Sequence, residues 1–224
     1  MKIVHTDSLG DTLDALNEAF FYGRALSSKE KIEAAKWIAS RQGLPRSYRG
    51  MFAPTDEDFR EGATMFTGEN VKTRGGSAHM LGQEACRALL LLDVDLPDVR
   101  AALDRASAGI DEALDSYPRH AGTYCCGKCS VSFWRHLSAG GLKNREGELS
   151  GGLAWVKSLR DGTGKWRRLP FYYTLLALDG IELPGAIQEM RYAAPVLDRM
   201  VKRSPRGEFG QRRLDLAERI LGKC

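Results

Sequence analysis

Residues 150–184 read SGGLAWVKSLRDGTGKWRRLPFYYTLLALDGIELP, and the rest of the chain is best interpreted from this stretch. It begins with an apolar segment around Trp155, which is predicted to be helical, and it turns at Asp161-Gly162. Gly164-Lys165-Trp166 follows, and a second apolar helix is expected to begin at Pro170-Phe171. An apolar segment, a glycine-containing turn and a second apolar segment are typical of two paired helices.

Similar turns occur upstream. Gly122-Thr123-Tyr124 agrees well with Gly164-Lys165-Trp166, and Ser47-Tyr48-Arg49-Gly50 is a looser case. Glycine permits a sharp reversal after a helix, and an aromatic side chain can pack against the start of the next helix. Buried helices are expected to start near residues 13, 79, 129 and 170, each followed by a longer helix with a polar face. This spacing, later about 40 to 50 residues, is typical of two-helix repeats.

The predicted fold class is all-α, with α/α hairpin repeats of about four inner/outer helix pairs that form an incomplete or short α/α toroid-like arc. A single all-α domain over residues 1–224 is expected. Strand patterns are nearly absent. The predicted helices span residues 11–26, with Asp11-Thr12 as the cap, and 28–43, 78–92, 97–117, 129–142, 149–160, 171–181, 186–201 and 211–221.

Residues 44–77 are rich in glycine, proline, threonine and charge, with no sustained period. A connection of this length is uncommon inside a compact domain unless it has a function or its own structure. We therefore expect a functional or partly ordered loop, or a short helix around Asp56 to Gly62.

Composition places the chain among soluble proteins. It has 224 residues, of which 43% are hydrophobic and 28% charged, far from the composition of disordered chains. The longest apolar run, Ala88 to Leu92, is much shorter than the roughly 20 residues of a membrane helix. The first residues lack the apolar segment of a signal peptide, so a cytoplasmic location is expected.

The charge pattern argues against nucleic acid as a partner. The net charge is +4, and the 29 acidic residues are interspersed with the 33 basic ones. Basic residues gather locally at Lys165 to Arg168 and from Lys202 to Arg213. A solvated basic face is the simplest interpretation of both runs.

The stretch from Trp155 through Trp166 resembles the glycine and tryptophan repeat of terpenoid cyclases and protein prenyltransferases, which build α/α toroids. Phe171-Tyr172-Tyr173-Thr174 is similar to a Phe-Tyr-His-Thr string of protein prenyltransferase β subunits, and Ser132-Phe133-Trp134 is similar to a Ser-Phe-Trp on another of their inner helices. The resemblance extends over about Ser28 to Arg203. It implies an apolar pocket between inner helices that binds an isoprenoid.

The chain departs from the family at the zinc site. Tyr173 stands where the family has a zinc-binding histidine, and Lys128 and Ser130 match the positions of its zinc-binding aspartate and cysteine. Cys129 is one residue out of register. The acidic signature of class II cyclases is also absent, with Asp93-Val94-Asp95-Leu96 as its nearest match. Whether the chain catalyses a reaction stays open, and a ring with fewer helical pairs than the family's could be completed by a second copy.

The predicted ligand pocket takes polar and aromatic groups from the inner helices. Charges inside an apolar helix, such as Glu84 and Arg87, must either pair with each other or line a solvated pocket. His79 lies seven residues before Cys86, and a hydrogen-bonded cap is the simpler interpretation of this histidine. The predicted pocket residues are His79, Glu84, Arg87, Phe133, Arg135, His136, Trp166, Tyr172 and Tyr173.

Cations near this pocket would bind an anionic leaving group. An enzyme acting on an isoprenoid diphosphate needs positive charge at the diphosphate. Lys165, Arg167 and Arg168 form the run next to Trp166 and are the predicted anion-binding residues. Arg74, Arg87 and Arg135 are further candidates.

Cysteines and histidines cluster at His120, Cys125, Cys126, Cys129 and His136. Five cysteines, an odd number, in a chain without a secretory signal argue for thiols or a metal site rather than disulfides. Thiolate and imidazole are ligands that zinc prefers, so zinc at Cys126 and Cys129 with Cys125 and His120 is one hypothesis. A redox dithiol with a lowered pKa beside Lys128 is a second, and small buried residues are a third.

Three functions follow from these patterns. The first is a prenyltransferase-like protein that binds a hydrophobic, isoprenoid-type small molecule. The second is a non-catalytic helical-repeat scaffold for a protein partner, since repeat arcs present extended surfaces. The third is a Cys/His metalloprotein. The expected partners are therefore a hydrophobic small molecule or a protein, with a homodimer as one assembly.

Overall fold

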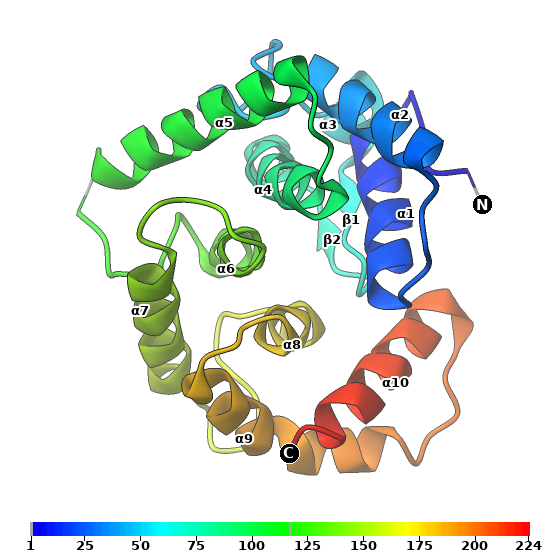
Figure 1. The fold of residues 1–224 in the computed structure, drawn as a ribbon. Helices are drawn as coiled ribbons and strands as arrows, with labels where there is room; N and C mark the ends of the chain where they lie inside the picture. Colours follow the sequence, from blue (N-terminus) through cyan, green and yellow to red (C-terminus); the bar gives the residue numbers. More distant parts are fainter. Residues whose placement is uncertain (1, 117) are drawn as a thin grey trace. The chain divides into compact units, whose positions relative to one another are not determined.

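The computed structural model describes residues 2–116 and 118–224, and this part of the chain is mostly helical (Figure 1). It contains ten α-helices and two strands of two residues each. Within the same residues, no helix is both long and apolar enough to cross a membrane. The helical fold class predicted from the sequence is confirmed.

The helices group into two compact units. Unit 1 comprises Met1–Met65, Asn70–Pro118 and Ala139–Lys143, and unit 2 comprises Phe66–Glu69, Arg119–Ser138 and Asn144–Cys224. Each unit has its own buried apolar residues. The expectation of a single domain stays a prediction.

Unit 1 is built around α4 (Arg74–Leu92), which packs against each of the unit's other helices. These are α1 (Leu9–Phe21), α2 (Ser28–Ser40), α3 (Asp56–Glu61) and α5 (Pro97–Asp115). The side chains of α4 are buried on nearly all sides, whereas α5 buries a single stripe. Both burial patterns agree with the expectations from sequence, because a helix that is apolar all round must lie inside a core.

The first helix begins earlier than predicted, and its cap is a different residue. Ser8 is the N-cap, and its Oγ accepts the Asp11 N–H at 2.9 Å. Asp58 of α3 accepts the N–H groups of Leu9 at 2.8 Å and Gly10 at 3.2 Å. The expected cap at Asp11-Thr12 is therefore wrong, since a carboxylate distant in sequence satisfies the N–H groups that a helix start leaves without partners.

The segment 44–77 is largely folded into unit 1. It contains α3, as predicted, and an antiparallel pair of strands, β1 (Ala63–Thr64) and β2 (Asn70–Val71). Met51, Phe52 and Met65 are buried, whereas Leu44, at the beginning of the segment, is exposed. The segment therefore contributes to the core, which explains why a stretch without helical period has a fixed structure.

Unit 2 contains two successive helical hairpins and a final helix. These are α6 (Gly127–Ser138), α7 (Arg145–Ser158), α8 (Phe171–Asp179), α9 (Pro184–Met200) and α10 (Gly207–Leu221). The helices α6 and α8 pack on each other and are mostly buried, and each packs on the helix that follows it. The helices α7 and α9 also pack together, and α10 packs on α8 and α9. Pro195 lies inside α9, which continues past it.

The two glycine turns of unit 2 share one geometry. Gly122 and Gly164 both have positive φ, +75° and +90°. A Cβ on Gly122 would lie 1.9 Å from the Gly152 nitrogen of α7, and a Cβ on Gly164 would lie 2.7 Å from Val196 of α9. Each turn therefore needs glycine both for its backbone conformation and for its close approach to the next outer helix.

The aromatic residue of each turn packs on a neighbouring aromatic ring. Tyr124 stacks on Phe133 of α6 with ring centroids 5.6 Å apart, and Trp166 contacts Phe171, the first residue of α8, at 5.9 Å. Both contacts join a turn to the buried helix that follows it. The expectation that the aromatic side chain packs against the start of the next helix is confirmed for Trp166, whereas Tyr124 packs further along α6, in its second half.

Candidate functional site

A cavity of about 370 Å³ lies in unit 2 and is the strongest candidate for a ligand site. Its walls come from the turn before α8, the first residues of α8 and the last turns of α9. The lining residues are Thr163, Lys165, Phe171, Tyr172, Val196, Arg199, Met200 and Arg203. We call this the basic cavity. Its volume is within the range of about 300 to 1,000 Å³ that small-molecule sites occupy.

The turn that presents Lys165 is held by Asp161. The Oδ1 atom of Asp161 accepts the backbone N–H groups of Thr163 at 2.8 Å and Lys165 at 3.3 Å, and these bonds hold the pKa of this exposed carboxyl below its usual range. The Asp161 N–H donates to the Lys165 carbonyl at 3.0 Å, which closes a short hairpin. The Gly162 N–H donates to the Tyr192 hydroxyl of α9 at 2.8 Å. Lys165 is therefore carried on a fixed backbone.

The opposite wall is one face of α9. Val196, Arg199, Met200 and Arg203 follow the spacing i, i+3, i+4 and i+7, which places side chains on one side of a helix. The Arg203 N–H donates to the Met200 carbonyl at 2.9 Å, so the helical path continues just beyond α9. Two guanidinium groups thereby reach the same cavity.

The lining carries three positive charges and no acidic side chain. The N-terminus of α8, which lacks a side-chain cap bond, adds partial positive charge, and the C-terminus of α9 adds partial negative charge. Each helix end carries roughly half a charge, so the two ends nearly cancel. Glu69, which is not a lining residue, accepts the Tyr173 N–H at 3.0 Å. The net character of the lining is cationic.

Aromatic rings form the remaining wall. Phe171 and Tyr172 lie edge to face with centroids 5.2 Å apart, and the Lys165 Nζ lies 5.4 Å from the centre of the Phe171 ring. The Arg213 guanidinium of α10 lies 4.5 Å from the centre of the Tyr172 ring. These contacts fix the rings, so the cavity offers flat apolar surface beside its cations.

Two of the residues predicted for ligand binding line this cavity, namely Lys165 and Tyr172. Arg167 and Arg168, predicted to bind the same anion, are exposed and are not part of the lining. Trp166 is buried, and its Nε1 donates to Glu189 of α9 at 2.9 Å. Trp166 therefore anchors its turn to α9 and does not contact the cavity.

The other predicted pocket residues of unit 2 lie in the packed layer of α6 and α8. Phe133, His136 and Tyr173 are fully buried, and Arg135 is 3% exposed. The Tyr173 hydroxyl and the Ser132 Oγ are 3.0 Å apart, and the Arg135 guanidinium lies 5.5 Å from the centre of the Tyr173 ring. Tyr173 is thus part of a buried polar contact between two helices.

The predicted residues of unit 1 form a separate polar group. Asn17 Nδ2 donates to Glu84 Oε2 at 3.3 Å, Arg87 Nη1 donates to Asn17 Oδ1 at 2.7 Å, and the Arg87 and Glu84 charges lie 3.9 Å apart. Pairing, rather than a solvated pocket, therefore accounts for these two charges. Asn17 is the third member that the sequence did not reveal.

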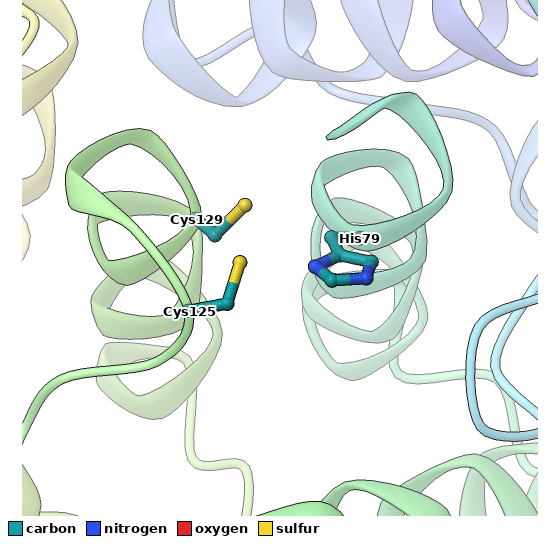
Figure 2. A group of neighbouring side chains, drawn as sticks. All are labelled: His79, Cys125 and Cys129. Atoms are coloured by element: carbon teal, nitrogen blue, oxygen red, sulfur yellow. The ribbon is translucent and has the colours of Figure 1, made fainter. Parts of the chain in front are cut away.

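His79 is not a helix cap. The N-cap of α4 is Thr73, whose Oγ1 accepts the Gly76 N–H at 3.2 Å, so His79 lies in the second turn of α4 (Figure 2). Its ring lies against Tyr48, with ring centroids 3.7 Å apart. Cys86 is fully buried, and burial raises the pKa of its thiol. The capping interpretation fails because α4 begins four residues earlier than predicted.

Three thiols meet at the start of α6, and we call Cys125, Cys126 and Cys129 the cysteine cluster. The sulfurs of Cys125 and Cys129 lie within 4.8 Å of each other and project from the same side of the helix (Figure 2). Hydrogen bonding to these two thiols and to the backbone N–H groups of Cys129 and Lys128 lowers the pKa of the Cys126 thiol. All five cysteines are free thiols, as predicted.

Hydrogen bonding among the three thiols lowers the pKa of one and raises the pKa values of the other two. The contact with Cys125 is the main cause that lowers the pKa of Cys126, and the same contact raises the pKa of Cys125. Contacts with the other two thiols, followed by burial, raise the pKa of Cys129. Cys126 is therefore the first thiol to ionise, and a helix N-terminus is the usual place for such a thiolate.

His120, predicted as a further metal ligand, contributes its backbone. Its carbonyl accepts the Thr123 N–H at 3.0 Å and the Thr123 hydroxyl at 2.7 Å. Within residues 2–116 and 118–224, the imidazole of His120 is not among the side chains that group within 4.8 Å of the cluster's sulfurs. The cluster of unit 2 is thus defined by sulfur alone.

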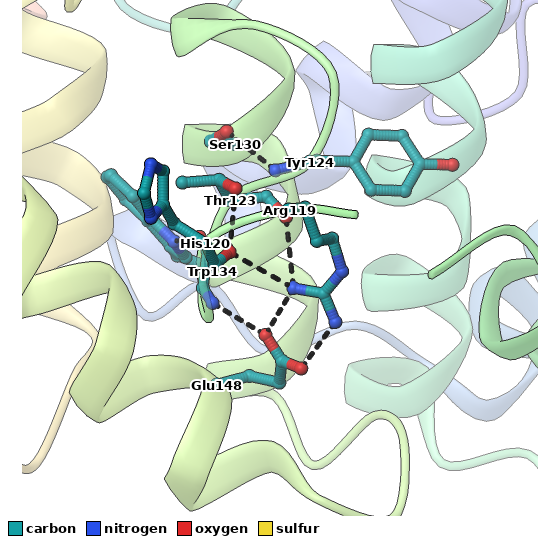
Figure 3. A network of polar contacts seen from close by, with 8 residues as sticks. Arg119, His120, Thr123, Tyr124, Ser130, Trp134 and Glu148 are labelled. Carbon is teal, nitrogen blue, oxygen red and sulfur yellow. Dashed lines mark hydrogen bonds and ion pairs between the residues drawn. The ribbon is translucent and has the colours of Figure 1, made fainter. Parts of the chain in front are cut away.

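The turn before the cysteine cluster is fixed by a charged network (Figure 3). Arg119 binds Glu148 of α7 through two bonds of 2.8 and 2.5 Å, and Glu148 also accepts the Gly122 N–H at 2.6 Å. Arg119 is the main cause that holds the pKa of Glu148 below its usual range. Trp134 Nε1 donates to the Gly122 carbonyl at 2.6 Å. The backbone leading to the cluster is therefore strongly constrained.

Comparison with known protein families, curated proteins and solved structures found no match to this chain. The fold and the site define a mostly helical protein with a cationic, aromatic cavity and a group of three thiols.

Sequence reasoning missed most of the basic cavity. Arg199 and Arg203 were not assigned a role, although Arg203 lies in the basic run that begins at Lys202. The available signal was the i, i+3, i+4, i+7 spacing of Val196 to Arg203, which mixes apolar and cationic side chains on one face. Thr163 and Phe171 gave no comparable signal, because their role depends on how the turn folds.

Proposed function

We propose that this protein binds an anionic small molecule that also carries an apolar part, and that an isoprenoid diphosphate is the ligand class. The single observation behind this proposal is the basic cavity, in which three cations and two aromatic rings line about 370 Å³ without an acidic side chain. The proposal keeps the prenyltransferase-like α/α arrangement expected from the sequence. It assigns binding to the chain and no catalytic step.

The cations suit a diphosphate. A guanidinium offers paired N–H donors that match two oxygens of a phosphate, and a lysine adds a mobile point charge. Arg199 and Arg203 approach from α9 and Lys165 from the turn. Hydrogen bonds between charged groups contribute roughly 1.5 to 3 kcal/mol each. Three such side chains therefore contribute about 4.5 to 9 kcal/mol before the cost of immobilising the ligand, so micromolar affinity also requires burial of the apolar part of the ligand.

The remaining lining suits a hydrocarbon chain. Phe171, Tyr172, Val196 and Met200 present aromatic and aliphatic surface, and methionine adapts well to flexible apolar ligands. Burial of apolar area adds about 25 cal/mol per Å². A ligand with both parts should therefore bind more tightly than either part alone.

Isothermal titration calorimetry and thermal unfolding with four probes test the proposal. The probes are inorganic pyrophosphate, geranyl diphosphate, farnesyl diphosphate and farnesol. We expect both prenyl diphosphates to raise Tm and to bind at least tenfold more tightly than pyrophosphate. Farnesol should give the smallest shift, because it lacks the anionic group that the cations recognise.

Charge-removing variants locate the site. Lys165→Gln, Arg199→Gln and Arg203→Gln should each weaken binding about tenfold or more. Lys202→Gln is the matched control, because Lys202 is exposed and adjacent to Arg203 but does not line the cavity. Absence of a Tm shift with every diphosphate, or an equal loss in the control variant, would refute the proposal.

The helical-repeat scaffold for a protein partner stays a prediction. The metalloprotein alternative is favoured by an observation of its own, the cysteine cluster.

A further inference from the structure

The cysteine cluster lies outside the basic cavity and has no part in the proposed ligand binding. Cys125 and Cys126 come directly before α6, and Cys129 is in its first turn. The first two are exposed and the third is buried. Three of the five cysteines of the chain therefore lie within five residues of one another at one helix end.

We propose that Cys125, Cys126 and Cys129 bind one thiophilic divalent cation, Zn²⁺, through three thiolate sulfurs. Zinc–sulfur bonds of about 2.3 Å in a tetrahedral site place the sulfurs about 3.8 Å apart. The sulfurs of Cys125 and Cys129 already lie within 4.8 Å of each other. The side chains of Cys125 and Cys126 are exposed, so they can rotate to bring their sulfurs to the distance that the ion requires, while the buried Cys129 side chain stays in place.

The surroundings offset the negative charge of the site. Three thiolates and one divalent cation carry a net charge of about −1, and the N-terminus of α6 supplies roughly half a positive charge. Lys128 adds a full positive charge to the same turn. The helix end therefore stabilises a thiolate-rich site.

The polypeptide around the cluster is preorganised. The Tyr124 N–H donates to Ser130 Oγ at 2.9 Å, and this bond closes the cluster's segment onto α6. Upstream, the pair of Arg119 and Glu148 together with Gly122 fixes the turn. A metal site gains affinity when its ligands are held before the ion binds, because less conformational freedom is lost.

A metal explains the cluster better than a redox pair does. Oxidation of Cys126 and Cys129 to a disulfide would use two thiols, release two protons and two electrons to an oxidant, and leave Cys125 unused. A tetrahedral cation uses all three thiols and leaves one coordination position for water or another ligand. This site also differs from the one implied by the family resemblance, whose positions fall on Lys128, Ser130 and Tyr173.

Metal analysis and Co²⁺ titration of the full chain test this proposal. Protein purified without an affinity tag under reducing, anaerobic conditions should bind one equivalent of Zn²⁺. Co²⁺ should produce thiolate-to-metal charge-transfer absorption whose intensity corresponds to three sulfurs. Zn²⁺ should protect the three cluster thiols from alkylation by iodoacetamide, while Cys224 is modified at an unchanged rate, because Cys224 is an exposed thiol outside the cluster.

Variants separate the cluster from unspecific thiol binding. Cys125→Ser and Cys126→Ser change exposed side chains, so both proteins should fold, and each should lower Zn²⁺ affinity at least tenfold. Cys224→Ser is the control and should bind Zn²⁺ as the wild type does. Three results would overturn the proposal. The first is less than 0.1 equivalent of bound metal in the presence of stoichiometric Zn²⁺, and the second is an equal loss of Zn²⁺ affinity in Cys224→Ser. The third is a Cys126–Cys129 disulfide in the anaerobic protein. None of these measurements depends on the basic cavity.

Discussion

Arg119 and Glu148 form a two-pronged ion pair that fixes the turn before α6, with nitrogen–oxygen distances of 2.8 and 2.5 Å. Arg160 and Glu189 form an equivalent pair at the next turn, with distances of 3.1 and 2.9 Å. In both pairs the arginine precedes a glycine–x–aromatic turn and the glutamate lies on the following outer helix. The partners are 29 residues apart in each case, so the two hairpins of unit 2 share this ion-pair arrangement.

The first prediction concerns acid sensitivity. Because the pKa of Glu148 is lowered in the folded protein, its charge stabilises the fold above the pKa of an unpaired glutamate, about 4.3. That contribution is lost as pH falls through the lower, folded-state value. Glu148→Gln should cost about 1 to 2 kcal/mol at pH 7, and its stability should fall less steeply than that of the wild type below about pH 4.5.

Chemical denaturation at several pH values measures this effect. Glu146→Gln is the control, because Glu146 is an exposed carboxylate on the same helix. Its stability should follow the wild-type pH profile closely. Parallel profiles for Glu148→Gln and the wild type would show that the ion pair does not contribute to acid sensitivity.

The second prediction concerns the crowded glycine turns. Gly122→Ala places a Cβ 1.9 Å from the Gly152 nitrogen and also forces alanine to φ +75°. Gly162→Ala meets the same kind of backbone strain at φ +85°, but has no atom within 4 Å of the new Cβ. Left-handed backbone costs an alanine about 1 to 2 kcal/mol, and the overlap at Gly122 adds about 1 to 3 kcal/mol or more.

Thermal unfolding of the two alanine variants measures how much the steric overlap at Gly122 destabilises the protein, because the backbone strain is similar in both. We expect Gly122→Ala to be several degrees less stable than Gly162→Ala, or to accumulate as unfolded protein. Equal Tm values would mean that α7 moves away from the turn at little cost.

The helices of this fold could be predicted from the sequence because their apolar residues recur with helical period. The apolar run from Ala78 to Leu92 indicated a buried helix, and the stripe from Val99 to Leu114 indicated a helix with one wet face. Helix ends were less predictable. Ser8 rather than Asp11 caps the first helix because Asp58, distant in sequence, completes the hydrogen bonding of that end.

The candidate site was only partly predictable. The basic run beside Trp166 indicated anion binding, but only Lys165 of that run lines the cavity. Neighbouring side chains of a tight turn point in different directions, so Arg167 and Arg168 cannot be separated from Lys165 by sequence alone. Arg199 completes the site from a helix more than thirty residues away, and such long-range convergence is set by packing rather than by any local pattern.

The third prediction concerns the start of α1 in unit 1. The Asp58 carboxylate, 2% exposed, accepts bonds from Ser8, Leu9, Gly10 and Thr55. Asp58→Asn removes the charge and replaces one acceptor oxygen with a donor amide, so at least one backbone N–H loses its partner. We expect a loss of about 2 to 3 kcal/mol.

Hydrogen exchange locates this third effect. The amides at the start of α1 and in α3 should exchange faster in Asp58→Asn. Asp56→Asn is the control, because Asp56 is an exposed residue in the same short helix. Unchanged exchange at Leu9 and Gly10 would contradict the proposed capping role.

The last prediction separates anchoring from ligand contact at Trp166. This side chain is 4% exposed, donates to Glu189 at 2.9 Å and does not line the basic cavity. Trp166→Phe keeps an aromatic ring but removes the donor, so stability should fall by about 1 to 2 kcal/mol. The affinity of Trp166→Phe for pyrophosphate, measured well below Tm, should stay within about twofold of the wild type. Tyr172→Ala is the comparison variant. It should weaken farnesyl diphosphate binding about tenfold or more, because it loses the ring surface that lines the cavity. A large loss of pyrophosphate binding in folded Trp166→Phe would instead assign Trp166 to the ligand site, as predicted from the sequence.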